Sequence, residues 1–517
     1  MRRISALQGF MRLNDEILRI FGDETVRSKF ISQMPLGSVA IADIEFDVFC
    51  RHELVPILMA LQYLYVERKE TIAEICRLIE AEVNANESKR LGVPGLTYWE
   101  ILVLAALRLG CDLDYDQLSD LASHHRKIRQ MMAISDWDGR RYPRSTINDN
   151  LTALSAKTLE AISQLVVDEG HRLCPEAVRS VRGDSYVLRK NIHYPTDANL
   201  VADGIRKVIA IANELAEDCR IGGWRQHAHL GNKARQIKRT IEKVAASRRK
   251  DKDSAIKACY RQLLNHYHMI MEQAVHTLHQ FDLVKDQLCW SVERRCTQLA
   301  SELQYFIGGS EYTAELARRR VIAGETIPHQ DKVFSLFEPD TELINRGKKP
   351  QPIEFGHRVM LVQDSAGFIV HSQVMGHGIT DEKILLEVMQ NLQQRYNGRI
   401  RAASFDKGFW TPNNLQQLSE IINLVVLPKK GKRSCADSLR EGAKDFGQAR
   451  CWHAGIESAI NALQAGNGLD VCRDKGVDGY RRYLALGVLG RNLHTLGNIF
   501  VDKERARRRK GSLQLAS

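Results

Sequence analysis

The sequence predicts a mixed α/β core that is preceded and interrupted by helical segments. Residues 1–175 carry apolar side chains at helical spacing, residues 176–198 change to a β-prone pattern, and residues 328–500 alternate between strand-like and helix-like runs. Helical spacing returns over residues 199–327, which predicts an all-helical insertion after the first core strand. Residues 501–517 are rich in Lys and Arg and are expected to form a mobile tail.

The N-terminal region is expected to contain short helices. Apolar spacing and start signals, including Thr97 as an N-cap, place them at Leu54 to Val66, Glu70 to Val83, Tyr98 to Arg108, Asp114 to Ala122 and Ser145 to Leu151. The last two, separated by a basic stretch and an aromatic turn, are typical of a helix-turn-helix that reads a DNA groove. They are equally typical of any helical bundle, so the sequence leaves both interpretations open.

The predicted core begins with one strand, which is followed after the insertion by a hairpin. Ala177 to Leu188 is β-prone, and Gly356 to Gln363 and Phe368 to Val374 flank the tight turn Asp364 to Gly367. The later elements are expected as a helix over 381–396, a strand over 400–406, a helix over 412–420, a strand over 421–427 and a helix over 453–463. This order is that of the ribonuclease-H-like fold, with a helical block inserted after the first strand.

Three acidic residues lie on three separate elements of this core. Asp184 lies in the first strand, Asp406 ends a later strand, and Glu457 lies in the helix that follows. Two strand-end aspartates and a helical glutamate supply the oxygen ligands that two Mg²⁺ ions need for phosphoryl chemistry. Each residue alone has an ordinary role as a turn residue, a helix cap or a solvated helix position. Together they are predicted as the catalytic and metal-binding residues, and His453, expected one helical turn before Glu457, as a supporting residue.

The charge of the chain favours a polyanionic partner. The net charge is +11 and the pI is about 9.1, which favours nucleic acid first and an acidic membrane surface second. Residues 225–252 carry ten Lys or Arg against two acids, and an arginine cluster follows at 318–320. Such runs commonly form a solvated helix face, but clustered cations on a basic protein favour phosphate contact. The predicted DNA-binding residues are Arg235, Lys238, Arg239, Arg248, Arg249, Lys250, Arg318, Arg319 and Arg320.

The sequence also predicts a soluble protein of the cytoplasm, without a membrane partner. It contains no signal-peptide pattern and no apolar run approaching the roughly 18 residues of a membrane span. Eleven cysteines are scattered singly without a CxxC pair, which favours reduced thiols over disulfides or a zinc ribbon.

Several blocks of the sequence resemble the DDE transposases of bacterial insertion sequences, most closely the ISNCY-type group. The blocks that carry the resemblance occur in order as Asn191 to Asp197, Lys332 to Glu338, Gly356 to Val359, Ser404 to Phe409, His453 to Leu463, Gly468 to Gly476 and Tyr483 to Leu496. By this resemblance, Asp184, Asp406 and Glu457 match the acidic triad of the family. The resemblance implies Mg²⁺-dependent nicking at element ends, with Mn²⁺ as a possible substitute, and 3′-hydroxyl attack on target DNA. It also implies terminal inverted repeats as the DNA partner and a homodimer or larger synaptic assembly. DNA-end binding is predicted for residues 1–175 on the basis of their helix-turn-helix-like pattern.

Two departures from better-known relatives limit what the resemblance implies. Relatives with a tyrosine–arginine–glutamate–lysine signature would have Arg at His453 and Lys at Gln464, so roles assigned to that signature are not transferred. Many relatives place their large insertion between the second acid and the glutamate, whereas here it follows the first strand. Two alternatives remain: a ribonuclease-H-like nuclease or resolvase, and a catalytically silent DNA-binding remnant.

Overall fold

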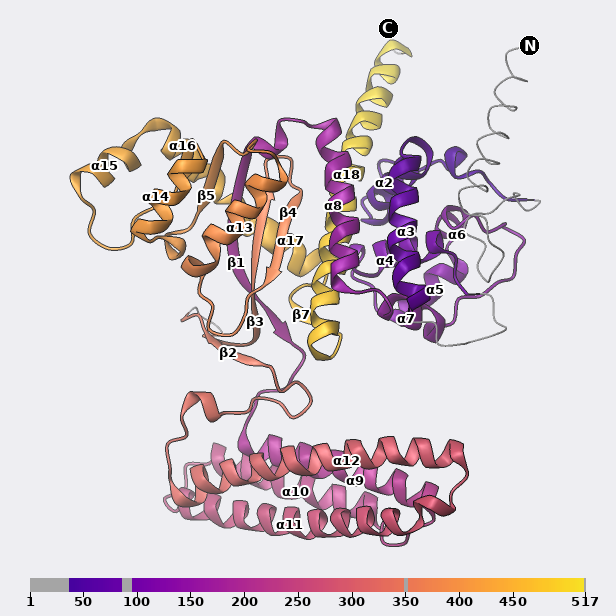
Figure 1. The fold of residues 1–517 in the computed structure, drawn as a ribbon, viewed down its shortest axis with the longest axis vertical. Coiled ribbons are helices and arrows are strands. Elements are labelled where there is room, and N and C mark those ends of the chain that lie inside the picture. The colour runs from indigo at the N-terminus through magenta and orange to yellow at the C-terminus, as the bar shows by residue number, and fades with distance from the viewer. Residues whose placement is uncertain (1–36, 86–94, 348–351, 516–517) are drawn as a thin grey trace. The chain divides into compact units, whose positions relative to one another are not determined.

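The chain folds into two compact units that are built around different kinds of core. The computed structural model describes residues 37–85, 95–347 and 352–515, and Figure 1 shows their helices and strands. The core unit combines Met1–Arg189 with His357–Ser517, and the inserted unit comprises Lys190–Gly356. The core unit joins helices to a mixed sheet, and the inserted unit is mainly helical, so the predicted mixed α/β class is confirmed.

The N-terminal part of the core unit is helical, as predicted. Its elements are η1 (Ile41–Asp43), α2 (Leu54–Glu67), α3 (Lys69–Ala85), α4 (Tyr98–Gly110), α5 (Tyr115–His124), α6 (Arg126–Met131), α7 (Arg144–Thr152) and α8 (Ala156–Leu173). Thr97 caps α4 as expected, because its side chain accepts the N–H of Glu100 while the Glu100 carboxylate accepts the N–H of Thr97. Every residue of α4 is buried, which makes this helix the centre of the helical part.

The C-terminal helix packs along the N-terminal helices and ties both ends of the core unit together. Helix α18 (Gly476–Leu515) contacts α2, α4 and α8, so these helices and the sheet share one apolar core. Close packing requires glycine here: a Cβ on Gly490 would lie 2.6 Å from the Gly110 backbone, and one on Gly497 would overlap the carbonyl of Pro56. The predicted tail 501–517 differs from expectation, because α18 continues through it as far as Leu515.

The sheet has strands β1 (Ser180–Lys190), β2 (Glu342–Asn345), β3 (Ile353–Asp364), β4 (Ile369–Val374), β5 (Ala402–Phe405), β6 (Leu424–Val426) and β7 (Val471–Cys472). Its order is β2-β3-β1-β5-β6, while β4 also pairs with β3 and β7 also pairs with β1. The predicted hairpin is confirmed as the antiparallel pair β3 and β4, and β5 runs parallel to both β1 and β6. Sequence patterns did not predict the short strands β2 and β7.

Strands β1 and β3 run antiparallel to each other. The Tyr480 hydroxyl donates to the carbonyl of Leu188 at 2.5 Å and accepts the N–H of His357 at 3.3 Å. Gly183 lies against the carbonyl of Leu361. Residue numbers thus rise along β1 as they fall along β3. The chain leaves the core unit at the end of one strand and returns at the start of its neighbour.

Helices connect the remaining strands and cover the sheet. They are α13 (Asp381–Arg395), α14 (Pro412–Ile421), α15 (Cys435–Gly442), α16 (Lys444–His453) and α17 (Gly455–Gly466), with the short turns η2 (Ala177–Arg179) and η6 (Lys407–Phe409). The predicted helices over 381–396 and 412–420 are confirmed. The helix predicted over 453–463 begins later than expected, at Gly455.

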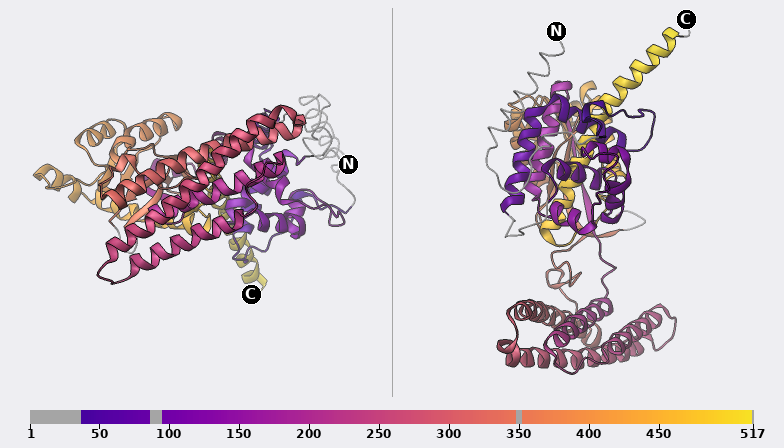
Figure 2. Two further views of the ribbon diagram at one scale, coloured as in Figure 1. Left: turned by 90° about the horizontal axis from the view of Figure 1, so that it is seen from below. Right: turned by 90° about the vertical axis from the view of Figure 1, so that its right-hand side faces the viewer.

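The inserted unit is a bundle of long helices. It contains α9 (Asp197–Cys219), α10 (His227–Ala246), α11 (Lys252–Val284) and α12 (Trp290–Ala317), the π-helical turn η4 (Arg318–Ala323), and the short turns η3 (Lys285–Gln287) and η5 (His329–Asp331). Figure 2 shows the long helices side by side, and α9 contacts α10, α11 and α12. Their facing sides form a separate apolar core in which Trp224 donates to the Thr277 hydroxyl at 2.8 Å.

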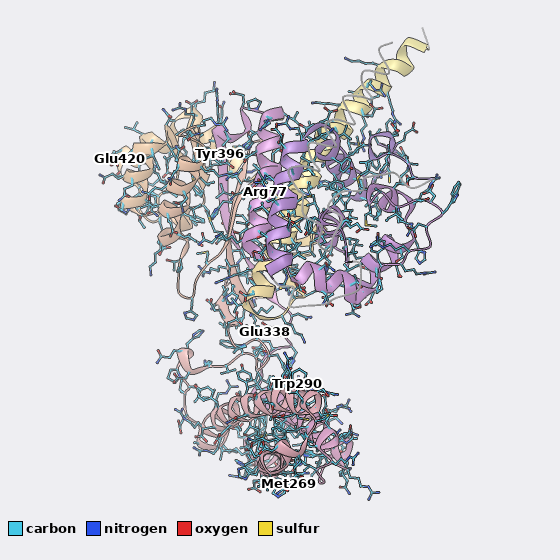
Figure 3. All side chains as sticks on the ribbon, turned by 45° about the vertical axis from the view of Figure 1, so that its right-hand side comes forward. Arg77, Met269, Trp290, Glu338, Tyr396 and Glu420 are labelled. Carbon is cyan, nitrogen blue, oxygen red and sulfur yellow. The ribbon has the colours of Figure 1, made fainter. Side chains whose placement is uncertain are left out.

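The incoming and outgoing segments of the inserted unit are held together. The buried Lys190 ammonium donates to the carboxylates of Glu338, at 2.8 Å, and Asp340 (Figure 3 labels Glu338). The rings of Tyr194 and Phe355 pack edge to face with centroids 5.6 Å apart. The unit therefore extends beyond the predicted insertion 199–327 and includes residues 328–356, which the sequence pattern had assigned to the core.

No helix in the described residues has the length and apolar character that a membrane crossing requires. All eleven cysteines carry free thiols, and four of these are exposed: Cys50, Cys289, Cys435 and Cys451.

Candidate active site

The register of β1 and β5 brings two of the predicted acids together. These parallel strands are paired from Ser180 opposite Ala402 to Gly183 opposite Phe405. Asp184 is the next residue of β1, within the strand and not at its end as predicted, and Asp406 directly follows β5. Since neighbouring strands lie about 4.8 Å apart and parallel partners in register point to the same face, the two aspartates are neighbours on one face of the sheet.

The two aspartates lie where β1 changes its partner strand. Asp406 directly follows β5 and caps η6, its Oδ1 accepting the N–H of Lys407 at 2.6 Å. Asp184 Oδ1 accepts the N–H of Ser185 at 2.7 Å. Further along, β1 pairs with β7, and the N–H of Arg189 donates to the carbonyl of Asp470. The sheet thus opens beside Asp184, which leaves Asp406 exposed and Asp184 partly buried.

Gly183 allows the strands to approach closely immediately before the first aspartate. A Cβ at this position would lie 2.5 Å from the Phe405 ring and 3.0 Å from the carbonyl of Leu361. Only glycine avoids both contacts, so the residue type at 183 helps to set the spacing of Asp184 and Asp406.

Glu457 lies in the first turn of α17 and is exposed. Its N–H bonds to the carbonyl of Ala454 at 3.3 Å, a tight turn that opens the helix. A carboxylate in the first turn interacts favourably with the positive end of the helix dipole.

The prediction that His453 and Glu457 share one helix is wrong. His453 ends α16, and Ala454 separates it from α17. His453 is nevertheless close enough to the second and third acids for both charges to act on it. Burial lowers its pKa, while Asp406, a hydrogen bond with the backbone of Ser404, and Glu457 oppose that shift. Its shielded Nδ1 has no hydrogen-bond partner among the described residues.

An arginine that the sequence reasoning missed accounts for the break between the two helices. Arg182 donates from Nη1 to the carbonyl of Trp452 at 2.7 Å, and its guanidinium lies 4.7 Å from the Trp452 ring centroid. Nε and Nη2 both donate to Gln363 Oε1 on β3, at 3.0 and 2.7 Å. Arg182 precedes Asp184 by two residues on β1, so alternation along the strand, which places both on one face, was the signal that could have identified it.

The donor set of the acids suits a hard divalent cation. Mg²⁺ binds through carboxylate oxygens, keeps several waters and needs only one or two carboxylates, which the adjacent Asp184 and Asp406 supply. In the described part of the chain, no group of three or more His, Cys, Asp or Glu side chains is close enough together to hold a metal ion. The structure therefore brings the two aspartates together and places Glu457 on a neighbouring helix, without a closed three-carboxylate cluster.

The predicted DNA-binding residues divide into two kinds in the inserted unit. All three arginines of η4 form ion pairs: Arg318 with Glu315, Arg319 with Glu325 and Arg320 with Asp197, each at 2.7 Å. These pairs neutralise the cluster that the sequence presents as a basic patch.

The basic surface of the inserted unit lies instead on α10 and the loop that follows it. Arg235, Arg239 and Lys243 are exposed at four-residue intervals, which forms one stripe along the helix. Lys238 pairs with Glu242 at 3.5 Å, and Arg249 pairs with Asp251, so the two acids of residues 225–252 offset only two of the ten cations. The remaining predicted residues, Arg248 and Lys250, are exposed in the loop.

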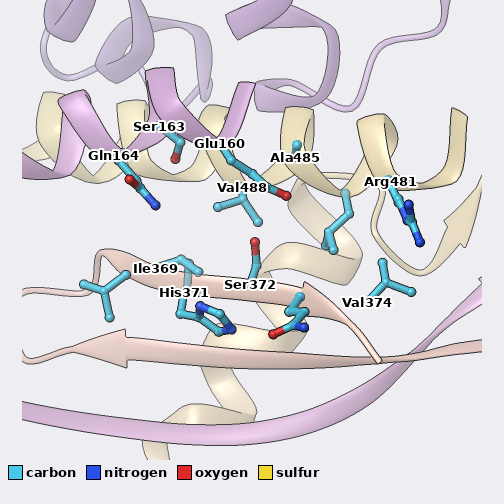
Figure 4. Close-up of a pocket in the computed structure, with 13 residues that line it drawn as sticks. Glu160, Ser163, Gln164, Ile369, His371, Ser372, Val374, Arg481, Ala485 and Val488 are labelled. Atoms are coloured by element: carbon cyan, nitrogen blue, oxygen red, sulfur yellow. The ribbon is translucent and has the colours of Figure 1, made fainter. Parts of the chain in front are cut away.

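A separate cavity of about 420 Å³ lies in the core unit between β4, α8 and α18 (Figure 4). Its lining includes Glu160, His371, Ser372 and Arg481. None of the predicted catalytic residues lines this cavity. Comparison of the chain with models of protein families, with curated proteins and with solved structures gives no match.

Proposed function

We propose that this chain is a DNA transposase of the bacterial insertion-sequence type that the sequence resembles, with a ribonuclease-H-like catalytic core. The observation that carries the proposal is the register of β1 and β5, because Asp184 and Asp406 are the residues that follow their last paired positions, Gly183 and Phe405. Two such carboxylates, with a third on the adjacent helix α17, are a suitable arrangement for metal-dependent chemistry on a phosphodiester.

The topology of the sheet supports the proposed fold. Strands β1, β3 and β4 form an antiparallel series, and β5 and β6 then run parallel to β1 on its other side. The acids occur on the first strand, directly after β5 and on a later helix, which is the order expected for a ribonuclease-H-like core.

The proposed cofactor is Mg²⁺, for which Mn²⁺ can substitute. Asp184, Asp406 and Glu457 would hold the metal, and the bound ions supply activation of the attacking oxygen and stabilisation of the leaving oxygen. The protein contributes the placement of these carboxylates. The N–H groups of Ser185 and Lys407 each occupy one oxygen of an aspartate and restrict its rotation.

The basic stripe on α10 supports double-stranded DNA as the partner. Clustered Lys and Arg release counterions from the DNA backbone when they bind, so the affinity falls steeply with salt. We expect the triple variant Arg235→Glu, Arg239→Glu, Lys243→Glu to bind DNA more weakly and with a shallower dependence on salt. Substitution of Arg318, Arg319 and Arg320 by Glu should change the affinity for DNA and its salt dependence less, because these side chains are already ion-paired. Fluorescence anisotropy at several salt concentrations distinguishes the two variants, and equal effects would contradict the assignment.

The catalytic proposal is tested with purified protein, Mg²⁺ and DNA that carries the sequences flanking its reading frame. End-specific nicking and joining, lost in Asp184→Asn, Asp406→Asn and Glu457→Gln, supports a transposase. Cleavage without end specificity supports a ribonuclease-H-like nuclease or resolvase instead. Binding without cleavage supports a catalytically silent remnant. A homodimer or larger synaptic assembly is part of the proposal, and light scattering of the complex with two DNA ends measures it.

A further inference from the structure

The starting residue of α17 depends on a side chain from β1. In an uninterrupted helix the carbonyl of Trp452 would accept the N–H of Ile456. Here this carbonyl accepts the N–H of Ala454 and a bond from Arg182. Helix α16 therefore ends, and α17 begins at Gly455 with Glu457 in its first turn.

The joint between α16 and α17 is shaped around the guanidinium. A Cβ on Gly455 would overlap Nη1 of Arg182. The stack of the guanidinium on the Trp452 ring holds the other side of the joint. Because the guanidinium is planar, these two contacts fix the orientation of its plane as well as the position of its charge.

The opposite end of the guanidinium is anchored in the sheet. Gln363 is buried on β3, and its Oε1 accepts both remaining bonds from Arg182. The Gln363 amide in turn donates to the carbonyl of Gly367 at 3.1 Å in the β3–β4 turn. A chain of hydrogen bonds thus links the hairpin, β1 and the joint before α17.

We infer that Arg182 is a positioning residue, which sets the orientation of Glu457 relative to Asp184 and Asp406 by fixing the joint between α16 and α17. The inference rests on the proposed function, since it concerns the third acid of the same site. Arg182 does not need to touch DNA or metal for this role. It acts through the backbone at Trp452 and through the space left by Gly455.

The test measures binding of Mn²⁺ alone to the full-length protein, using the electron paramagnetic resonance signal of free Mn²⁺. Loss of a residue that orients the metal ligands without binding the metal itself typically weakens metal binding 10- to 100-fold. We expect a loss of about this size in Arg182→Ala. Gly455→Ala should reproduce it by displacing the guanidinium, and the double variant should bind no more weakly than either single one. Arg182→Lys should also bind weakly, because a lysine keeps the charge but cannot make the three bonds and the stack.

Arg179→Ala is the matched control. Arg179 lies just before the same strand, is exposed and pairs with Glu176 at 2.7 Å, so its removal also costs one positive charge. It should retain the wild-type affinity for Mn²⁺. Thermal unfolding of each variant separates a general loss of stability from a loss of metal affinity in the folded protein.

The outcomes separate the two proposals. If the wild-type protein binds Mn²⁺, Asp184→Asn abolishes that binding and Arg182→Ala leaves it unchanged, the positioning role is refuted while the metal site stands. Additive losses in the double variant would also refute it, because the two changes would then act independently. If the wild-type protein shows no binding that depends on Asp184, the proposed metal site fails and the inference falls with it.

Discussion

His371 should make the core unit less stable in acid. This histidine lies on β4 beside the cavity of Figure 4, where its Nε2 is shielded and has no hydrogen-bond partner among the described residues. Burial lowers its pKa to about 4, opposed only by a hydrogen bond with Gln373. The charged groups that face it across the cavity are Glu160 on α8 and Arg481 on α18. The folded state therefore favours the neutral imidazole of His371 over the protonated one.

The size of the effect follows from the two pKa values. In the unfolded chain a histidine has a pKa of about 6.5. As the pH falls, the unfolded state therefore takes up a proton before the folded state does. The resulting loss in the free energy of unfolding is small above pH 6.5 and grows towards pH 4. Linkage gives a loss of about 2 kcal/mol at pH 5 and about 3 kcal/mol at pH 4. These are upper values, because the ring is partly exposed to the cavity.

The measurement is urea unfolding of the wild-type protein and of His371→Gln at pH 7, 6 and 5. The difference in free energy of unfolding isolates His371, because the other titrating groups are common to both proteins. We expect the variant to gain stability relative to wild type as the pH falls. His377→Gln, in the exposed loop after β4, should follow the wild-type curve. A difference between His371→Gln and wild type that stays constant from pH 7 to pH 5 would refute the reasoning.

Three further predictions concern packing and hydrogen bonding. Tyr480→Phe removes the hydroxyl that joins β1 to β3 and leaves the buried carbonyl of Leu188 without that partner. The free energy of unfolding, measured in urea, should fall by about 1–3 kcal/mol, and a smaller fall would mean that water replaces the hydroxyl. Gly497→Ala should lower the free energy of unfolding by about 1–3 kcal/mol or more, because the added methyl group would overlap the backbone of α2. Gly308→Ala, whose Cβ meets nothing within 4 Å in α12, should instead be neutral or stabilise by up to about 1 kcal/mol, and thermal melting compares the two.

Local signals in the sequence predicted those parts of the fold that are determined locally. The capping residues Thr97 and Glu100 fixed the start of α4, and the turn at 364–367 fixed the hairpin of β3 and β4. The break before α17 could not be predicted in this way, because its cause, Arg182, lies 270 residues from Trp452. The spacing of apolar residues predicts a helix but gives no information about a side chain from a distant strand that ends it.

The same limit applies to charge and to the candidate site. Arg320 belongs to a basic run in the sequence, but its partner Asp197 lies on another helix of the inserted unit, so a count of neighbouring charges overestimates the free positive charge. The position of Asp406 directly after a strand could be predicted, since hydrophobic alternation marks where strands stop, but Asp184 lies inside β1 and not at a strand end as expected, because β1 continues to Lys190. Their adjacency depends on strand register, which the sequence pattern alone does not give.

The paired ends of the inserted unit affect how the chain folds. Strands β1 and β3 are neighbours in space, yet residues 190–356 separate them along the chain. Closing a flexible loop of that length costs about 0.6 kcal/mol for each doubling over a short turn, on the order of 2–3 kcal/mol in all. An inserted unit that folds first, with Lys190 and Glu338 already joined, removes most of that entropy loss. We therefore expect early folding of the helical bundle to speed the pairing of β1 with β3, on which the sheet depends.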